Sequence, residues 1–246
     1  MFNILTLNKI SKVGLDKLDP AKYTCSDSVE APDAILVRSA SMHEMTLSPA
    51  TLAIGRAGAG VNNIPVADFG AQGVAVFNTP GANANAVKEL VLCSLFLASR
   101  KVASAVDWCK TLKGEGDAVG KLVEKGKSAF AGPEILGKTL GVIGLGAIGT
   151  LVAEGAKALG MDIVGYNPKL SEERIADLTS KGIKLMSSLD ELYAASDYIT
   201  LHLPLNDSTR GMINGEAIAK MKDGVRILNF ARGASVSYTH LTLPTT

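Results

Sequence analysis

The sequence has little net charge, few aromatic residues and no long hydrophobic run. Its 246 residues carry a formal net charge of +1 at pH 7, and aromatic side chains make up 5% of them. A chain so close to neutral gives no electrostatic reason to expect nucleic acid or an anionic membrane surface as a partner. No apolar run is long enough to span a bilayer, and no basic region with a cleavage site opens the chain. These absences predict a cytoplasmic protein.

Cysteine and histidine are also scarce, with three of each. Cys25, Cys93 and Cys109 have no spacing typical of a metal site or a redox pair, so we expect no metal, and buried free thiols in a reducing compartment. The hydrophobic content of 47% is ample for buried cores, and the 25 glycines suit close-packed α/β layers. A chain of this length can hold one large domain or two modest ones.

The most informative stretch is a glycine-rich turn between two short apolar segments. Leu140 to Ile143 is apolar, too short for a core helix, and leads directly into Gly144-Leu145-Gly146-Ala147-Ile148-Gly149. A helical pattern follows and ends near Gly160, and a second apolar segment runs from Ile163 to Tyr166. Strand, glycine turn, helix and strand in this order are the context that a dinucleotide-binding fingerprint requires.

Each glycine of this turn has a physical role in that interpretation. Gly144 permits the tight turn, Gly146 lets a pyrophosphate approach the backbone, and Gly149 lets the helix pack close to the strand. The helix N-terminus presents free N–H groups and the positive end of a dipole to the phosphates. The alternative is a glycine-rich turn of an ordinary α/β protein, which the two flanking strands disfavour.

The residue that follows the second apolar segment departs from the dinucleotide pattern. An acid that binds the ribose hydroxyls is expected there, and the sequence has Asn167. Asparagine can still hydrogen-bond a ribose hydroxyl, but it lacks the negative charge that repels a 2′-phosphate. We therefore predict NAD as the cofactor, preferred over NADP by a smaller margin than an acid would give.

Residues 1–83 alternate short apolar runs with helical patterns, which predicts a flavodoxin-like α/β domain. The expected strands are Asn3 to Leu7, Ala34 to Val37, Leu52 to Gly55 and Val74 to Phe77. The expected helices are Ser11 to Leu18, Met45 to Ala50 and Val66 to Gln72. Polar loops follow the strands, at the edge where ligands bind in open α/β sheets.

A single long helix is expected over residues 84–106, either crossing between two domains or packing in a core. Residues 110–137 are polar and glycine-rich, which predicts a loop with one short helix. Residues 107–233 as a whole are expected to form a Rossmann nucleotide-binding domain. Its expected elements beyond the fingerprint are helices Glu172 to Lys181, Leu189 to Ala194 and Gly215 to Met221, and strands Lys184 to Met186, Tyr198 to Leu201 and Val225 to Leu228.

The last residues, 234–246, break the α/β rhythm. They are rich in serine and threonine, with no helical period and no charge except at His240. A Rossmann strand is normally followed by a helix that crosses back over the sheet, and this segment cannot supply one. We expect irregular structure after Gly233, a nucleotide-binding domain that is incomplete at its C-terminus, and a non-native tail.

Six segments, taken together and in this order, carry a family resemblance. They are Val37 to Ser39, Arg56 to Ile64, Val76 to Gly81, Gly144 to Gly149, His202 to Leu205 and Asn229 to Gly233. Over residues 1–233 the chain resembles the NAD-dependent D-2-hydroxyacid dehydrogenases, most closely those that act on D-3-phosphoglycerate in serine biosynthesis. The resemblance implies an oxidoreductase that transfers a hydride from the 2-hydroxyl carbon to NAD, with residues 1–83 as the substrate-binding domain.

The resemblance also assigns roles to individual residues on the substrate side. It implies substrate contacts from Arg38, Ser39, Arg56, Ala59, Gly60 and Asn83, and a catalytic role for Arg232. Arg232 would hold the carboxylate or carbonyl oxygen by forked hydrogen bonds, the alternative being a solvated loop arginine. Backbone N–H groups of Ala59 and Gly60 would bind the carboxylate, and Arg38 and Arg56 are candidates for a substrate phosphate. For Arg38, Arg56 and Asn83 the alternative is a surface or loop-stabilising residue.

On the cofactor side, the resemblance implies contacts from the fingerprint and from the loops around it. The expected cofactor-binding residues are Gly144, Gly146, Ala147, Ile148, Gly149, Asn167, Thr79, His202, Pro204 and Ala231. His202 lines the dinucleotide site in this pattern and is not expected to be the base. The family uses a histidine oriented by a glutamate, both after the position of Arg232, and no residue here matches either one. We therefore expect the chain as written to be inactive.

Two other functions stay open at this point. One is a dehydrogenase or reductase of another small D-2-hydroxy acid, such as glyoxylate or lactate. The other is a catalytically dead, NAD-sensing scaffold, against which the retention of Arg232 and of the carboxylate-binding loop argues. The resemblance further implies a homo-oligomer, most simply a dimer formed through the nucleotide-binding domains, with the 84–106 helix as a candidate contact.

Overall fold

The chain folds into two compact units, Met1–Asn83 and Ala84–Thr246. The structure is a computed structural model and describes residues 1–241. Each unit is an α/β layer structure built on a five-stranded sheet in which every pair of strands is parallel. The expected fold class, two Rossmann-like parallel-sheet domains, is confirmed.

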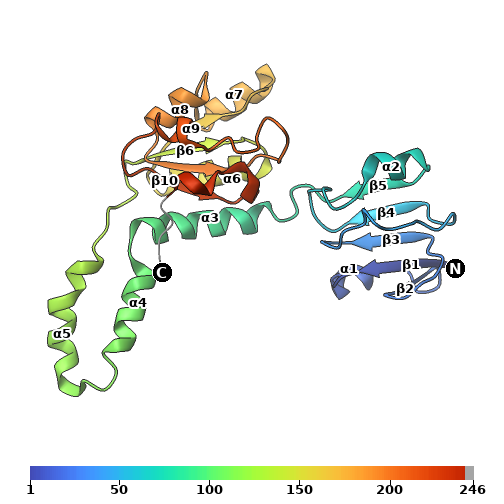
Figure 1. Ribbon diagram of the computed structural model, residues 1–246, viewed down its shortest axis with the longest axis horizontal. Helices are drawn as coiled ribbons and strands as arrows, with labels where there is room; N and C mark the ends of the chain where they lie inside the picture. Colours follow the sequence, from blue (N-terminus) through green and yellow to red (C-terminus); the bar gives the residue numbers. More distant parts are fainter. Residues whose placement is uncertain (242–246) are drawn as a thin grey trace. The chain divides into compact units, whose positions relative to one another are not determined.

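The first unit has the strand order β2-β1-β3-β4-β5 (Figure 1). Its strands are β1 (Phe2–Leu7), β2 (Tyr23–Ser26), β3 (Ala34–Val37), β4 (Ala53–Arg56) and β5 (Ala75–Asn78), and its helices are α1 (Lys12–Leu15) and α2 (Val66–Ala71). The last residues of four strands, Leu7, Val37, Arg56 and Asn78, are aligned in register, each with its neighbour. The loops that follow them therefore leave the sheet at one edge.

Two expectations for the first unit were wrong. Strand β2 was missed, because its four residues include a single half-buried aromatic and no alternating apolar pattern. No helix forms over Met45 to Ala50. Ser48 precedes a proline, which disfavours the helical conformation, and its Oγ and carbonyl oxygen instead accept the N–H groups of Ala50 and Thr51 in a turn.

The second unit has the strand order β10-β9-β6-β7-β8. Its strands are β6 (Thr139–Ile143), β7 (Asp162–Tyr166), β8 (Lys184–Leu185), β9 (Tyr198–Leu201) and β10 (Arg226–Asn229). Its α-helices are α3 (Ala84–Ser99), α4 (Val102–Thr111), α5 (Val119–Gly126), α6 (Ala147–Ala158), α7 (Glu172–Ser180), α8 (Leu189–Ala195) and α9 (Gly215–Ile218). Short 3-10 turns are η1 (Gly116–Ala118), η2 (Lys127–Phe130), η3 (Gly233–Ser235) and η4 (Tyr238–His240).

Helices cover both faces of this second sheet (Figure 1). One buried cluster joins the sheet to α3, α6 and α7, through Val91, Val152 and Leu178 among others. A second cluster joins it to α8 and α9, through Leu192 and Ala217. A parallel sheet buried on both faces explains why its strands are continuous apolar runs rather than alternating ones.

The expected single helix over residues 84–106 is divided in two. Helix α3 ends at Ser99, whose Oγ donates to the carbonyl oxygen of Leu95 at 2.6 Å and also shares a 2.7 Å hydrogen bond with the hydroxyl of Tyr198. A serine that bonds back to its own helix in this way tends to bend or end it. Arg100 and Lys101 connect α3 to α4, which begins at Val102. The role of this segment as an inter-domain helix stays a prediction.

The segment after β10 is more ordered than expected. Val236 forms a parallel bridge with Ile213, and both Ser235 and Val236 are buried, while residues 234–241 form two 3-10 turns and no α-helix or strand, as expected. Residues 242–246 of the predicted tail lie outside the described residues. Its assignment as non-native stays a prediction.

The cysteines are less buried than expected. Cys25 is half-buried, while Cys93 and Cys109 are exposed. Cys93 lies two residues from both Val91 and Leu95, the buried positions of α3, and therefore on the other face of that helix. Among residues 1–241, no helix is both long enough and apolar enough to cross a bilayer.

Candidate functional site

The glycine-rich turn between β6 and α6 has the geometry of a phosphate-binding loop. Gly144 has a φ of +95°, and a Cβ there would lie 2.7 Å from the carbonyl oxygen of His202. A Cβ on Gly149 would lie 1.9 Å from the carbonyl oxygen of Gly144. Gly146 has no atom within 4 Å of its Cβ position, so its backbone is open to approach. Two glycines are thus required by close packing and the third leaves room for a ligand.

Helix α6 begins at this turn and points its N-terminus at the same opening. Gly146 is the N-cap, and the first helical hydrogen bond runs from the N–H of Thr150 to its carbonyl oxygen at 3.0 Å. The N–H groups of Ala147, Ile148 and Gly149 belong to the first turn, where no intrahelical acceptor exists. Together with the helix dipole they form a binding site for an anionic pyrophosphate.

Two side chains from the next βα unit hold the peptide groups of Leu145, the middle residue of the turn. The Oδ1 of Asn167 accepts the N–H of Leu145 at 3.2 Å, and Arg174 Nη2 donates to the carbonyl oxygen of Leu145 at 3.2 Å. The same Nη2 donates to Thr150 Oγ1 at 2.6 Å, and Nη1 is paired with Asp177. Sequence reasoning found Asn167 but missed Arg174, because no local pattern connects α7 to a loop that precedes it by more than twenty residues.

His202 lies beside this turn and is held as a neutral imidazole. Its backbone N–H donates to the carbonyl oxygen of Ile143 at 2.8 Å, and its Nε2 shares a 2.9 Å hydrogen bond with Thr200 Oγ1. Burial lowers the pKa of His202 to about 4. Its Nδ1 is shielded from solvent and has no hydrogen-bond partner among the described residues. Pro204 follows in the same loop, and its carbonyl oxygen accepts the hydroxyl of Thr209.

The loop after β10 carries Ala231 and Arg232. Asn229, the last residue of β10, shapes this loop: its Oδ1 accepts the N–H of Ala231 at 3.1 Å and its Nδ2 donates to the carbonyl oxygen of Arg232 at 2.9 Å. The residues Ile143, Leu201 and Asn229 are in register across the sheet. The structure therefore brings the glycine turn, His202 and the exposed Arg232 to one edge of the second sheet.

The first unit presents its predicted substrate residues at the corresponding edge of its own sheet. Arg38 and Ser39 follow β3 and are exposed, and Ala59 and Gly60 lie in the loop after β4. Asn78, which sequence reasoning did not single out, donates to the carbonyl oxygen of Ala59 at 2.7 Å and braces this loop. No hydrogen bond within residues 1–241 uses the N–H of Ala59 or Gly60.

Other predicted residues of the first unit are only partly brought together. The N–H of Thr79 donates to the carbonyl oxygen of Gly58 at 3.0 Å, so Thr79 lies against the same loop. Asn83 is exposed at the end of the unit. The two arginines proposed for a phosphate line adjoining cavities that share Ile10 and Ala57: Arg56 a largely apolar one of about 320 Å³, and Arg38 one of about 470 Å³.

Comparison with known proteins decides the family. Residues 92–242 match the family model described as D-isomer specific 2-hydroxyacid dehydrogenase, NAD binding domain. The chain belongs to this family. NAD is accordingly the cofactor of the second unit, and the residues present fit it: the open backbone at Gly146 and the free first turn of α6 face one site.

Several relatives are similar over most of the chain. D-3-phosphoglycerate dehydrogenase from Mycobacterium tuberculosis is 41% identical over 212 residues, which are 85% of this chain and 37% of that protein. Hydroxypyruvate reductase from Thermotoga maritima is 42% identical over 207 residues, 83% of this chain and 62% of that protein. The chain thus spans between a third and two thirds of the length of these two dehydrogenases.

A solved structure of the family agrees with the fold. D-lactate dehydrogenase from Aquifex aeolicus, in complex with NAD and lactic acid, is 27% identical with a TM-score of 0.75. The match covers 97% of this chain and 71% of that structure.

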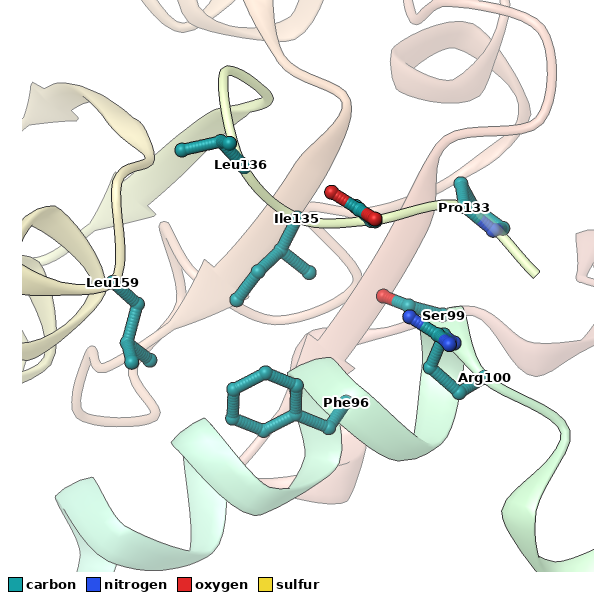
Figure 2. Close-up of a pocket in the computed structure, with 8 residues that line it drawn as sticks. Phe96, Ser99, Arg100, Pro133, Ile135, Leu136 and Leu159 are labelled. Atoms are coloured by element: carbon teal, nitrogen blue, oxygen red, sulfur yellow. The ribbon is translucent and has the colours of Figure 1, made fainter.

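A further cavity of the second unit lies away from the glycine turn (Figure 2). It has a volume of about 210 Å³ and is lined by Phe96, Ser99 and Arg100 of the α3 end, by Pro133 to Leu136, and by Leu159. Leu136 precedes β6 and Leu159 follows α6, so the cavity lies at the amino end of β6. The cofactor loop lies at the carboxyl end, and this cavity is therefore no part of the dinucleotide site.

Proposed function

We propose that the chain binds D-3-phosphoglycerate and NAD and belongs to an enzyme that oxidises the 2-hydroxyl of this substrate, the entry to serine biosynthesis. The observation that carries the proposal is the loop after β4, whose N–H groups at Ala59 and Gly60 are without an acceptor in the described chain. These groups suit a carboxylate. The 41% identity to the mycobacterial D-3-phosphoglycerate dehydrogenase supports the choice of substrate.

The proposed roles follow from the chemistry of a 2-hydroxy acid. NAD, when bound, accepts the hydride from the carbon that bears the hydroxyl. The N–H groups of Ala59 and Gly60 hold the carboxylate, and the exposed guanidinium of Arg232 binds the substrate oxygens by forked hydrogen bonds. The hydroxyl proton must pass to a base. His202 is not assigned to this step, because its imidazole is engaged with Thr200 and its pKa is about 4.

A second candidate is reduction of hydroxypyruvate or a similar unphosphorylated acid. The observation that favours it is the 42% identity to the Thermotoga hydroxypyruvate reductase. The two candidates differ in whether a phosphate contributes to binding.

Calorimetric titration of the purified chain tests the proposal. NADH and a 2-hydroxy acid cannot react with each other, so binding of D-3-phosphoglycerate and D-glycerate can be measured with NADH present. We expect D-3-phosphoglycerate to bind at least tenfold more tightly. Equal binding would favour the second candidate, and binding of neither acid would refute both. Arg232→Lys should weaken binding of both acids, because an ammonium cannot replace the forked guanidinium.

We also propose that the chain forms a homodimer through its second unit. The second unit exposes several large apolar side chains, namely Phe96, Leu97, Val102, Val106 and Leu136. Phe96 and Leu136 line the cavity of Figure 2, and Val102 and Val106 line a second cavity that shares Arg100 with it. Apolar side chains gathered in this way are typical of a protein–protein interface. Light scattering at micromolar concentration should give the mass of a dimer, and Phe96→Glu should shift it toward the monomer. A monomer in the unchanged protein would refute this proposal.

A further inference from the structure

Asn8, directly after β1, has an unusual backbone. Its φ is +68°, and it is the one non-glycine residue with a positive φ among residues 1–241. Asparagine tolerates this left-handed region better than most residues. Its side chain reaches the loop after β3, where Oδ1 accepts the N–H of Ser39 at 3.0 Å and the N–H of Ala40 at 2.6 Å. The side chain of Asn8 thus links the residues that follow β1 to the loop that follows β3.

Two cationic side chains next to these hydrogen bonds line one cavity. Lys9 follows Asn8 and Arg38 precedes Ser39, and both line the cavity of about 470 Å³ together with Ile10, Ser11 and Ala57. Within the described chain, neither Lys9 nor Arg38 forms an ion pair with an acid. Ser11 adds a hydroxyl, which makes no capping hydrogen bond with α1.

Two positive groups held around one cavity repel each other unless an anion lies between them. The cavity also adjoins the proposed carboxylate site. Ala57, which lines it, is two residues before Ala59 and donates its N–H to the carbonyl oxygen of Val37 at 2.7 Å. Two residues of chain span at most about 7 Å, and less here because the N–H of Gly58 donates to the carbonyl oxygen of Arg56 in a turn. An anion in the cavity therefore lies within reach of a short acid whose carboxylate is bound by Ala59 and Gly60.

We propose that Lys9, Arg38 and Ser11 form the subsite for the phosphate group of the substrate, with Lys9 as a specificity-determining residue. The inference rests on the proposed function and changes which residues are proposed to bind the phosphate group. Sequence reasoning paired Arg38 with Arg56, and Arg56 lines the adjoining, largely apolar cavity, which shares Ile10 and Ala57 with this one. Lys9 is the cation that lines the same cavity as Arg38. The subsite selects phosphorylated acids over unphosphorylated ones of the same length.

The test compares Lys9→Met with Lys12→Met, a matched control that removes an exposed lysine outside the cavity. With NADH present, Lys9→Met should weaken binding of D-3-phosphoglycerate about 10- to 50-fold, the usual effect of losing a charge-assisted hydrogen bond. Binding of D-glycerate should stay within twofold. Lys12→Met should stay within twofold for both acids. Unchanged phosphoglycerate binding in Lys9→Met, or equal losses for both acids, would overturn the inference.

A second measurement separates the inference from the proposed function. Inorganic phosphate, titrated into the isotope-labelled chain, should shift the backbone amide signals of Lys9, Ser11 and Arg38, and these shifts should vanish in Lys9→Met. Asn8→Gly allows the same backbone conformation but removes the acceptor of the N–H groups of Ser39 and Ala40. It should weaken phosphate binding severalfold. If the chain binds no 2-hydroxy acid and these shifts are still seen, the proposed function fails and the anion subsite stands. If the shifts are absent, the subsite fails.

Discussion

The carbonyl oxygen of Leu145 accepts a hydrogen bond from Arg174 Nη2 at 3.2 Å. The N–H of the same residue donates to Asn167 Oδ1, so both peptide groups of the residue between Gly144 and Gly146 are fixed by side chains of the following βα unit. A glycine-rich turn has many accessible conformations, and ordering it costs free energy on binding. The two contacts preorganise the turn, and the second unit thereby meets the cofactor with its backbone already placed.

Asn167→Asp should increase the preference for NAD over NADP. A carboxylate can still accept the N–H of Leu145, and its charge repels a 2′-phosphate. We expect the dissociation constant of NADPH to rise about tenfold or more, and that of NADH to stay within about threefold. Fluorescence titration with NADH and NADPH measures both. Asn85→Asp, on the exposed face of α3, should change neither. Tighter NADPH than NADH binding in the unchanged chain would contradict the prediction of NAD preference.

Arg174→Met should weaken NAD binding about tenfold. The substitution keeps much of the side-chain length but removes the donors to Leu145 and Thr150, so the turn must be ordered on binding. Arg210→Met, at an exposed turn of the same unit, is the control. The readout that separates positioning from general damage is the NAD affinity at a temperature where thermal unfolding shows both variants fully folded. Unchanged affinity would show that the turn does not need Arg174.

Sequence patterns predicted the elements that are determined by nearby residues. They missed features that involve contacts between residues far apart in the chain. The order of β6, α6 and β7 follows from glycine spacing and apolar runs within thirty residues, and it was predicted correctly. The end of α3 at Ser99 was missed; the Ser99 hydroxyl bonds back to Leu95 and also to the hydroxyl of Tyr198, which lies 99 residues further along the chain. No periodicity in the helix itself contains that information.

The same division applies to the candidate site. Arg38 and the loop at Ala59 could be found because they follow apolar runs at a strand end. Lys9 and Arg38 line one cavity next to a hydrogen bond that the N–H of Ser39 donates to Asn8 Oδ1, 31 residues away. The contact of Arg174 with Leu145 spans 29 residues. When a side chain of one element holds a loop of another, the sequence around neither residue has a pattern that indicates the contact.

Acid should destabilise the second unit through His202. Burial lowers its pKa to about 4, whereas an unfolded chain has a histidine pKa of about 6.5. Between these values the unfolded state binds more protons than the folded state. The contribution of His202 to the free energy of unfolding is therefore complete above pH 6.5 and is lost as the pH drops toward 4. The contribution lost is up to about 3 kcal/mol. Urea unfolding at pH 7 and pH 5 measures it, and His202→Gln should reduce the difference. An equal pH dependence in both proteins would show that another group is responsible.

The chain of 246 residues should bind its ligands but turn over D-3-phosphoglycerate very slowly, because neither His202 nor His43 is available to accept the hydroxyl proton. His202 is neutral, engaged with Thr200 and weakly basic, and the ring of His43 is hydrogen-bonded to the carbonyl oxygen of Asn62 at 2.9 Å. A missing general base typically costs about 10²- to 10⁴-fold in rate. NADH formation should therefore be at least 100-fold slower than with the mycobacterial relative under the same conditions, and added imidazole should partly restore it. Turnover within tenfold of that relative would contradict the prediction, and loss of that turnover in His202→Gln, but not in His43→Gln, would then identify His202 as the base.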